Sequence, residues 1–154
     1  MGAVKCLIYL ALLGLASQLI GMSLPRRLFD RDGFLFRARG FEKGGRIYER
    51  LGIRRWKDKV PDMSRIVKSM EPKSIKTAFS AEAADRMIRE TCVAELTHLL
   101  LALLGFPCVL LWQGWGWLAW GLYALGNMPF VMIQRYNRPR YVAVLKRYEA
   151  RGQS

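Results

Sequence analysis

Two long stretches without a charged side chain most constrain what this chain can fold into. Twenty residues separate Lys5 from Arg26. Thirty-nine residues separate Glu95 from Arg135, and the only interruption among them is the single histidine, His98. A helix needs about 20 apolar residues to cross the core of a bilayer, with a working range of about 17–25. The first stretch therefore predicts one membrane span, and the second predicts two short ones.

The expected fold is an all-α integral membrane protein, with three transmembrane helices and a basic cytoplasmic or interfacial cap. The spans are expected at residues 4–24, 96–112 and 118–133, within one membrane domain covering 1–154. A cleaved signal peptide is the alternative for the first span, since Lys5 and the apolar run after it resemble the start of a signal. The run is long for a signal and has no clean Ala-x-Ala cleavage site, which favours a retained span.

The positive charge gathers in the segments outside the predicted spans. Residues 25–90 hold eighteen of the twenty-five Lys and Arg against ten of the twelve acids, and the tail, 134–154, is also basic. Basic loops tend to stay in the cytoplasm. We therefore expect a multi-pass protein of the cell membrane with its N-terminus outside and its cap, tail and active site on the cytoplasmic side. A basic loop tethered between spans suits anionic lipid headgroups rather than nucleic acid.

The cysteines and the histidine give no metal or disulfide pattern. Cys6, Cys92 and Cys108 lie in or beside apolar runs, without paired spacing or a Cys-x-x-Cys motif, and are expected to be buried small hydrophobic residues. Glu95 and His98 have the Glu-x-x-His spacing of metal sites in helix bundles. Such sites need further ligands, and the chain has no second histidine. We therefore expect neither a metal nor a cofactor.

A polar face precedes the second predicted span. At about 100° per residue, Thr91, Glu95 and His98 fall within an arc of about 60° on one side of a helix. The same arc continues through Ala102 and Gly105, whose small side chains would leave a groove for an acyl chain or for a neighbouring helix. Because ionisable groups at membrane depth are costly, they favour a functional role.

The second and third predicted spans form a hairpin that turns near Gly114. This hairpin brings a second polar face to the same depth in the membrane as the first. His98 then lies level with about Val131, and Glu95 lies level with Arg135. A Glu95–Arg135 ion pair that only holds the hairpin together is the structural interpretation of this match, and it is compatible with a function. The second face consists of polar residues within one arc of the last helix: Asn127, Gln134, Arg138 and Tyr141.

Five motifs, in order along the chain, carry a resemblance to a known family. They are Arg46-Ile47-Tyr48, Trp56-Lys57-Asp58-Lys59-Val60-Pro61, Glu90-Thr91-x-x-Ala94-Glu95-x-x-His98, Asn127-Met128-Pro129 and Gln134-Arg135-Tyr136-Asn137-Arg138-x-Arg140. Together they resemble the glycosyl-4,4′-diaponeurosporenoate acyltransferase family. That family is known for placing a fatty acyl chain on the sugar hydroxyl of a carotenoid glycoside, in the last step of staphyloxanthin synthesis. The resemblance implies a small membrane acyltransferase and leaves its acceptor open.

The predicted function is transfer of a fatty acyl chain to a hydroxyl of a glycolipid or other lipid. His98 is the expected general base, because a histidine can take a proton near neutral pH. Glu95 or Glu90 is expected to hold its tautomer and stabilise the imidazolium. Contacts to the donor's phosphates, the developing oxyanion and a headgroup are expected from residues of the last helix and the cap: Asn127, Gln134, Arg135, Asn137, Arg138, Trp56 and Lys57.

The expected partners follow from that reaction. They are membrane lipids, an acyl donor (acyl-CoA or acyl carrier protein) and a lipid or glycolipid acceptor, and formation of a homo-oligomer is left open. The alternative function is a non-catalytic membrane adaptor that binds anionic lipid and partner proteins, since a basic surface and small-residue stripes need no catalysis. A small lipid methyltransferase is a third class, but no nucleotide-binding fingerprint supports it.

Overall fold

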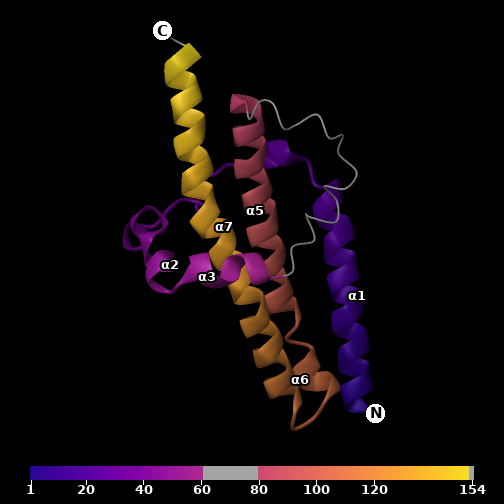
Figure 1. Cartoon of the computed structure of the whole chain (residues 1–154). Coiled ribbons are helices and arrows are strands. Elements are labelled where there is room, and N and C mark those ends of the chain that lie inside the picture. The colour runs from indigo at the N-terminus through magenta and orange to yellow at the C-terminus, as the bar shows by residue number, and fades with distance from the viewer. Residues whose placement is uncertain (61–79, 153–154) are drawn as a thin grey trace.

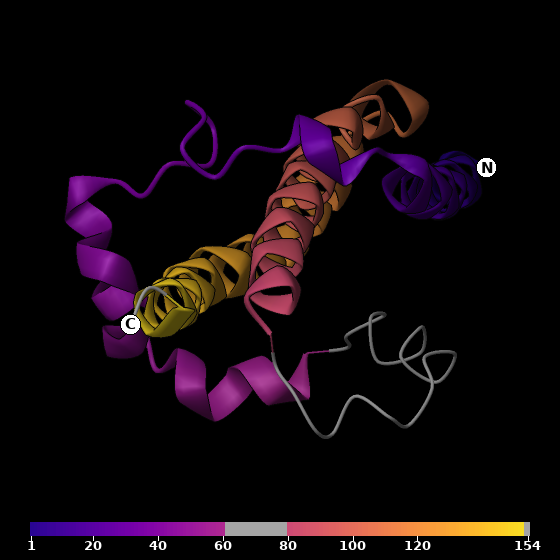
Figure 2. The same ribbon diagram turned by 90° about the horizontal axis from the view of Figure 1, so that it is seen from above.

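Three long helices, α1, α5 and α7, set the shape of the molecule (Figure 1). The computed structural model describes residues 1–60 and 80–152, in which α1 is Gly2–Ser23, α5 is Ala81–Leu104 and α7 is Gly116–Gly152. Every regular element within these two ranges is a helix, which confirms the all-α prediction. α5 lies between α1 and α7 in both ribbon views (Figures 1 and 2).

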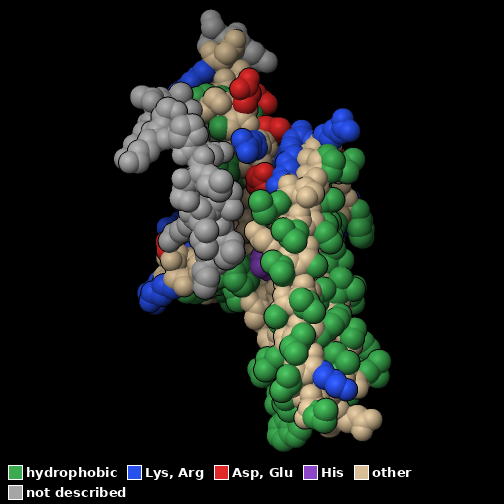
Figure 3. All heavy atoms as spheres, turned by 90° about the vertical axis from the view of Figure 1, so that its right-hand side faces the viewer, with side chains coloured by type: hydrophobic (Ala, Val, Ile, Leu, Met, Phe, Trp, Pro, Cys, Tyr) green, Lys and Arg blue, Asp and Glu red, His purple; other side chains and the backbone are tan. Residues whose placement is uncertain are grey.

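Among the described residues, two stretches are long and apolar enough to cross a membrane. They are Gly2–Ser23 and Ala81–Leu111, and an 18-residue window within each has a mean hydropathy of 1.9. Only 6% of the apolar part of α1 is buried inside the molecule, so most of its side chains face outward. Figure 3 shows hydrophobic side chains over most of this side of the molecule, with charged side chains mainly toward one end. An apolar surface of this extent is typical of a helix that lipid surrounds.

The ends of α1 and α5 follow local sequence signals. α1 stops at Ser23, just before Pro25, which lacks a backbone N–H and disfavours a helical conformation in the residue ahead of it. η1 (Arg26–Leu28) follows. α5 begins after Ser80, whose Oγ accepts a hydrogen bond from the backbone N–H of Ala83 at 3.1 Å. From there α5 continues unbroken past His98.

The second expected span, 96–112, is not a single helix. α5 ends at Leu104, a short turn contains Pro107, and α6 (Cys108–Leu111) follows. The break arises because Pro107 cannot continue the backbone ladder of α5. Gly105 allows a close approach beside this break, since a Cβ there would lie 2.8 Å from Cδ1 of Tyr123 on α7.

α7 runs antiparallel to α5 and includes both the third expected span, 118–133, and the tail, 134–154, as far as Gly152. It passes through Pro129 and Pro139 without ending. Near the C-terminal end of α7, Leu145 packs on two buried residues of the first turns of α5, Ala84 and Ile88. The predicted hairpin of the last two long segments is therefore present.

The described part of the cap, residues 25–60, curves around α7 as a series of short helices (Figure 2). They are η2 (Gly40–Gly45), α2 (Arg46–Arg50), α3 (Ile53–Trp56) and η3 (Lys57–Lys59). A buried cluster of Tyr48, Ile53 and Tyr136 fastens α2 and α3 to α7. Positions 61–79, which the expected cytoplasmic segment 25–90 also includes, lie outside the described residues, as does Pro61 of the second motif.

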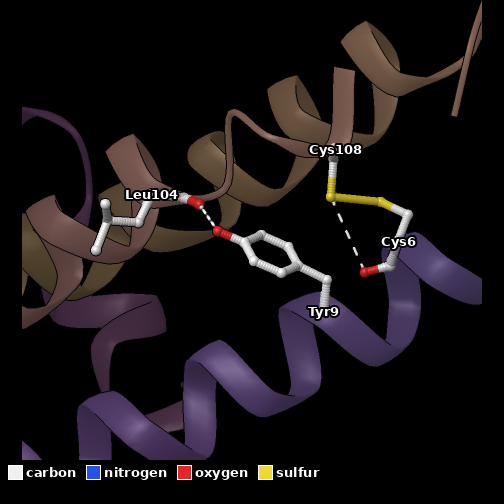
Figure 4. Close-up of a disulfide and its surroundings, with 4 residues drawn as sticks. All are labelled: Cys6, Tyr9, Leu104 and Cys108. Atoms are coloured by element: carbon white, nitrogen blue, oxygen red, sulfur yellow. Dashed lines mark hydrogen bonds between the residues drawn. A yellow bond between two sulfur atoms is a disulfide. The ribbon is translucent and has the colours of Figure 1, made fainter. Parts of the chain in front are cut away.

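A disulfide joins Cys6 of α1 to Cys108 of α6 (Figure 4). The expectation that these two cysteines are only small hydrophobic residues was therefore wrong, whereas Cys92 is free and buried as expected. The pair is 102 residues apart in sequence, so no spacing pattern indicates it, and only the packing of α1 against α6 brings the two sulfurs together. Beside the disulfide, Tyr9 Oη donates a hydrogen bond to the carbonyl oxygen of Leu104 at 2.6 Å.

Replacing Cys6 by serine should lower the stability of the protein by about 2–4 kcal/mol, because the cross-link restricts the unfolded chain. The measurement is the midpoint of thermal unfolding of the purified protein in detergent, with and without a reductant. Reduced wild type should match Cys6→Ser, and Cys92→Ser should respond to the reductant as the wild type does. Equal midpoints for oxidised and reduced wild type would contradict a stabilising cross-link.

Candidate functional site

Glu95 lies at the centre of a buried ion-pair network between α5 and α7. Its side chain is 0% exposed, and it accepts a hydrogen bond from Arg135 Nε at 2.6 Å. Its second oxygen accepts from Nη2 of Arg138, which also donates through Nε to Thr91 Oγ1 at 2.9 Å. A buried carboxylate requires such partners, since an uncompensated buried charge costs several kcal/mol. The Glu95–Arg135 ion pair expected from the hairpin is therefore present.

The same two arginines hold the cap against the helix pair. Arg135 donates to Oε1 of Glu42 at 2.8 Å and to the carbonyl oxygen of Leu35 at 2.7 Å. Arg138 donates to the carbonyl oxygen of Phe36 at 2.6 Å. One set of side chains thus fixes α5, α7 and the cap to one another. We call this set the arginine–carboxylate network: Glu42, Thr91, Glu95, Arg135 and Arg138.

Glu42 is the carboxylate that the cap contributes to the network. It is buried and accepts hydrogen bonds from Tyr48 Oη at 2.6 Å and from the backbone N–H of Arg39 at 2.8 Å, besides that from Arg135. Burial would raise the pKa of the Glu42 carboxyl, but the hydrogen bonds donated by Tyr48 and Arg135 hold that pKa below its usual value. Burial and the hydrogen bond to Glu42 raise the pKa of Tyr48. At neutral pH the pair is therefore a carboxylate and a neutral phenol.

His98 lies one helical turn beyond Glu95, outside the network. Its Nδ1 is 2.9 Å from Oδ1 of Asn127, and its ring stacks on Phe130 with centroids 4.3 Å apart and planes 11° from parallel. This contact confirms that the polar faces of the two helices converge. The side chain is half-buried, and the histidine, purple in Figure 3, is visible beside the hydrophobic side chains of that face.

The carboxylates expected to orient His98 have other partners. Glu95 is bound by the two arginines of the network. Glu90 forms a two-pronged ion pair with Arg26, just after α1, with the closer contact at 2.9 Å. The expectation that Glu95 or Glu90 holds the His98 tautomer is therefore corrected. The physical reason is that a guanidinium offers a carboxylate paired, charge-assisted hydrogen bonds, which a neutral imidazole does not.

The remaining residues expected on the last helix differ in their surroundings. Asn127 is buried, with Nδ2 donating to the carbonyl oxygen of Tyr123 at 2.9 Å and Oδ1 facing His98. Gln134 and Asn137 are half-buried, and neither side chain has a hydrogen bond to another residue in the described part of the chain. Asn127 is thus placed against the histidine, whereas the other two retain free polar groups.

Trp56 and Lys57 lie in the cap rather than beside His98. Trp56 packs against the cluster around Tyr136, and its Nε1 donates to the carbonyl oxygen of Leu51 at 3.2 Å. Lys57 pairs with Asp58 at 3.1 Å. Within residues 1–60 and 80–152, no hydrogen bond or ion pair joins either of them to the network.

Sequence reasoning missed Glu42 and Phe130. Glu42 stands alone among the basic and aromatic residues of positions 34–46, and an isolated acid in such a stretch was a signal for an ion-pair partner elsewhere. Phe130 gave no signal, since an aromatic residue in an apolar run is expected in any span. Only the register of α5 against α7 places its ring on the histidine.

A cavity of about 170 Å³ lies between the cap and α7, beside the network. Among the described residues, its charged lining consists of three arginines and two carboxylates, and Glu95 adds a third carboxylate directly behind two of those arginines. Within this part of the chain the positive charge is therefore balanced, which favours a neutral polar group over the donor phosphates expected at Arg135 and Arg138. The charged residues are Arg31, Asp32, Glu42, Arg135 and Arg138.

Comparison with known sequences identifies the class of protein. Residues 25–147, which include the network, His98 and Asn127, match a family model of acyltransferases, so the chain is an acyltransferase. The family is described as glycosyl-4,4′-diaponeurosporenoate acyltransferase, and the chain belongs to it. This confirms the family that the five motifs indicate.

Two curated relatives with that name come from Staphylococcus aureus, strains bovine RF122 / ET3-1 and MRSA252. Each is 27% identical to this chain over 152 residues, which cover 96% of this chain and 90% of the relative. No solved structure gives a significant match. The comparisons thus establish the acyltransferase family and leave the roles of individual residues to the geometry of the site.

Proposed function

We propose that the protein is a membrane O-acyltransferase that moves a fatty acyl chain to a hydroxyl of a glycolipid or other lipid, with His98 as general base. The observation that carries this proposal is the position of the only histidine in the chain. It is half-buried in an apolar helix, one turn below a buried charge network, where a lipid hydroxyl can approach it from the membrane interface. The name of the relatives, which specifies a glycosyl compound, supports a glycolipid acceptor.

In the proposed reaction the acyl donor is a thioester, either acyl-CoA or acyl carrier protein. The acceptor hydroxyl gives its proton to the imidazole of His98 while its oxygen attacks the thioester carbonyl carbon. The carbon–sulfur bond then breaks, and the imidazolium returns the proton to the leaving sulfur. The products are an ester and a thiol, so neither a covalent enzyme intermediate nor a metal is required.

The other polar groups of the site bind substrate in this proposal. Gln134 and Asn137 on α7 contact the headgroup or the developing oxyanion, since their side chains are half-buried and have no hydrogen-bond partner among the described residues. Arg135 has five N–H donors and uses three in its hydrogen bonds to Glu95, Glu42 and Leu35, which leaves donors for a substrate oxygen. Arg138 lines the cavity beside it. In the cap, Trp56 and Lys57 seat the headgroup.

The reaction itself is tested with purified protein in lipid nanodiscs, a labelled acyl thioester and a glycolipid acceptor. The expected result is a labelled ester of the glycolipid, and a diacylglycerol acceptor with a single free hydroxyl tests whether the sugar is needed. Lipid profiles of cells with and without the protein identify the natural product. Absence of any ester from all acceptors, with lipid binding retained, would favour the non-catalytic adaptor instead.

We further propose three spans, α1, α5 with α6, and the first half of α7, with the N-terminus outside. The disulfide supports this orientation, because disulfides persist on the oxidising side of a membrane and are rare in the cytosol. A cysteine at Gln113 should react with an impermeant thiol reagent on intact cells, and one at Lys59 should react only after permeabilisation. Native background is low, since Cys92 is buried and the other two cysteines are joined. The opposite labelling pattern would reverse the topology.

A further inference from the structure

We infer that Asn127 is a positioning residue that fixes the tautomer of His98, with the proton on Nδ1 and the lone pair on Nε2. The functional consequence rests on the proposed role of His98 as general base, but the assignment of the proton does not. Asn127 thereby takes the role that the sequence suggested for a carboxylate. Two hydrogen bonds and one ring stack hold the imidazole in place, all of them between α5 and α7 or within α7.

The backbone of α7 determines the orientation of the Asn127 amide. Its Nδ2 lies 2.9 Å from the carbonyl oxygen of Tyr123, one turn earlier on α7. A carbonyl oxygen can only accept a hydrogen bond, so the amide nitrogen must face it. The reverse orientation would place two acceptors against each other at a buried position, since Asn127 is only 7% exposed. The backbone of α7 therefore turns Oδ1 toward the histidine.

The orientation of the Asn127 amide determines which nitrogen of the imidazole carries the proton. Oδ1 of Asn127 is also only an acceptor, and it lies 2.9 Å from Nδ1 of His98. Nδ1 must therefore donate, which means that it carries the hydrogen. A neutral imidazole has one N–H, so Nε2 is left with a lone pair. The nitrogen with the lone pair is the one that can accept a proton from a substrate hydroxyl.

A ring stack determines the plane of the imidazole. Phe130, three residues after Asn127 on the same helix, stacks on the imidazole with planes 11° from parallel. The stack sets the plane of the ring, and the hydrogen bond sets its rotation within that plane. Two residues of α7 thus determine the direction in which Nε2 points. The orienting partner is a neutral amide, so it fixes the tautomer without adding a charge to the apolar surroundings.

Because His98 is the only histidine, ¹⁵N-histidine labelling gives one imidazole whose two nitrogens can be assigned without ambiguity. The experiment records the ¹⁵N resonances of the full-length protein in nanodiscs, at a pH where the imidazole is neutral. We expect wild type to have a protonated Nδ1 and an unprotonated Nε2. Asn127→Leu should lose this state and give a mixture or the Nε2–H form. The matched control is Leu125→Ala, an exposed position two residues earlier on α7, which should keep the wild-type spectrum.

The values of kcat and KM are measured for the same three proteins, wild type, Asn127→Leu and Leu125→Ala. Asn127→Leu should lower kcat by about 10–100-fold, a loss of the size seen when the hydrogen-bond partner of a metal-bound histidine is removed, with a smaller change in KM. A wild-type spectrum with the proton on Nε2 overturns the inference, and so does an Asn127→Leu spectrum identical to wild type. If both spectra are as expected but the activity of Asn127→Leu is unchanged, the tautomer assignment stands and Asn127 is not a positioning residue for catalysis.

Discussion

Replacement of His98 by alanine should lower turnover by about 10²–10⁴-fold, the usual contribution of a positioned general base. The loss is expected in kcat, because the imidazole accepts the proton of the acceptor hydroxyl during the reaction. Binding of the substrates through their acyl chains should change little. The measurement is the initial rate of ester formation by purified protein at saturating donor and acceptor. The rate of the wild type should also rise with pH and then level off, since the base must be neutral to act.

Leu100→Ala provides the control for that substitution, because Leu100 lies two residues away on α5 with its side chain exposed. It shortens an apolar residue on the same helix and should leave the rate close to wild type. A similar small effect in His98→Ala would show that His98 is a structural residue, whose ring merely fills the space between Asn127 and Phe130. Ester formation would then need another base.

Glu95→Gln should destabilise the folded protein by about 3–5 kcal/mol, the usual cost of breaking a buried ion pair. The substitution keeps the size of the side chain but removes the charge, and leaves the buried guanidiniums of Arg135 and Arg138 short of a carboxylate. Glu42 compensates only Arg135. The measurement is chemical or thermal unfolding in detergent, followed by helix content.

Glu90→Gln is a close control, because it makes the same change on the same helix in another Glu–Arg pair. The side chains of that pair, Arg26 and Glu90, are 27% and 37% exposed. Exposed pairs contribute about 0–1 kcal/mol, so Glu90→Gln should have a small effect. Equal losses in the two variants would mean that burial of Glu95 does not determine the strength of its contacts.

The long-range arrangement of the site was predictable because two simple geometric rules apply. Helical periodicity places Glu95 and His98 on one face, and the symmetry of a hairpin about its turn places Arg135 level with Glu95 and about Val131, one turn from Asn127, level with His98. Neither rule depends on the shape of the cap. The Glu95–Arg135 ion pair and the contact between His98 and the last helix follow from them directly.

The partners within the site were harder to predict, because each depends on a contact that no periodicity determines. The sequence suggested a carboxylate next to His98, but Asn127 lies there instead. The cap supplies a second acid, Glu42, and the two arginines bind Glu42 and Glu95. The disulfide between Cys6 and Cys108 depends on how α1 packs against the end of α6. In each case the contact joins two segments whose relative positions cannot be derived from the sequence.

The network also constrains the order in which the protein can be completed. Glu42 and Arg135 are 93 residues apart, so a growing chain contains the carboxylate long before the guanidinium that pairs with it. Until α7 is made, Glu42 and the carboxylate of Glu95 on α5 lack the guanidiniums of Arg135 and Arg138 that pair with them in the folded protein. A chain truncated before α7 would therefore lack the contacts that hold the cap, however complete its own sequence. We therefore expect the contacts between the cap and α7 to form only after the final helix is in place.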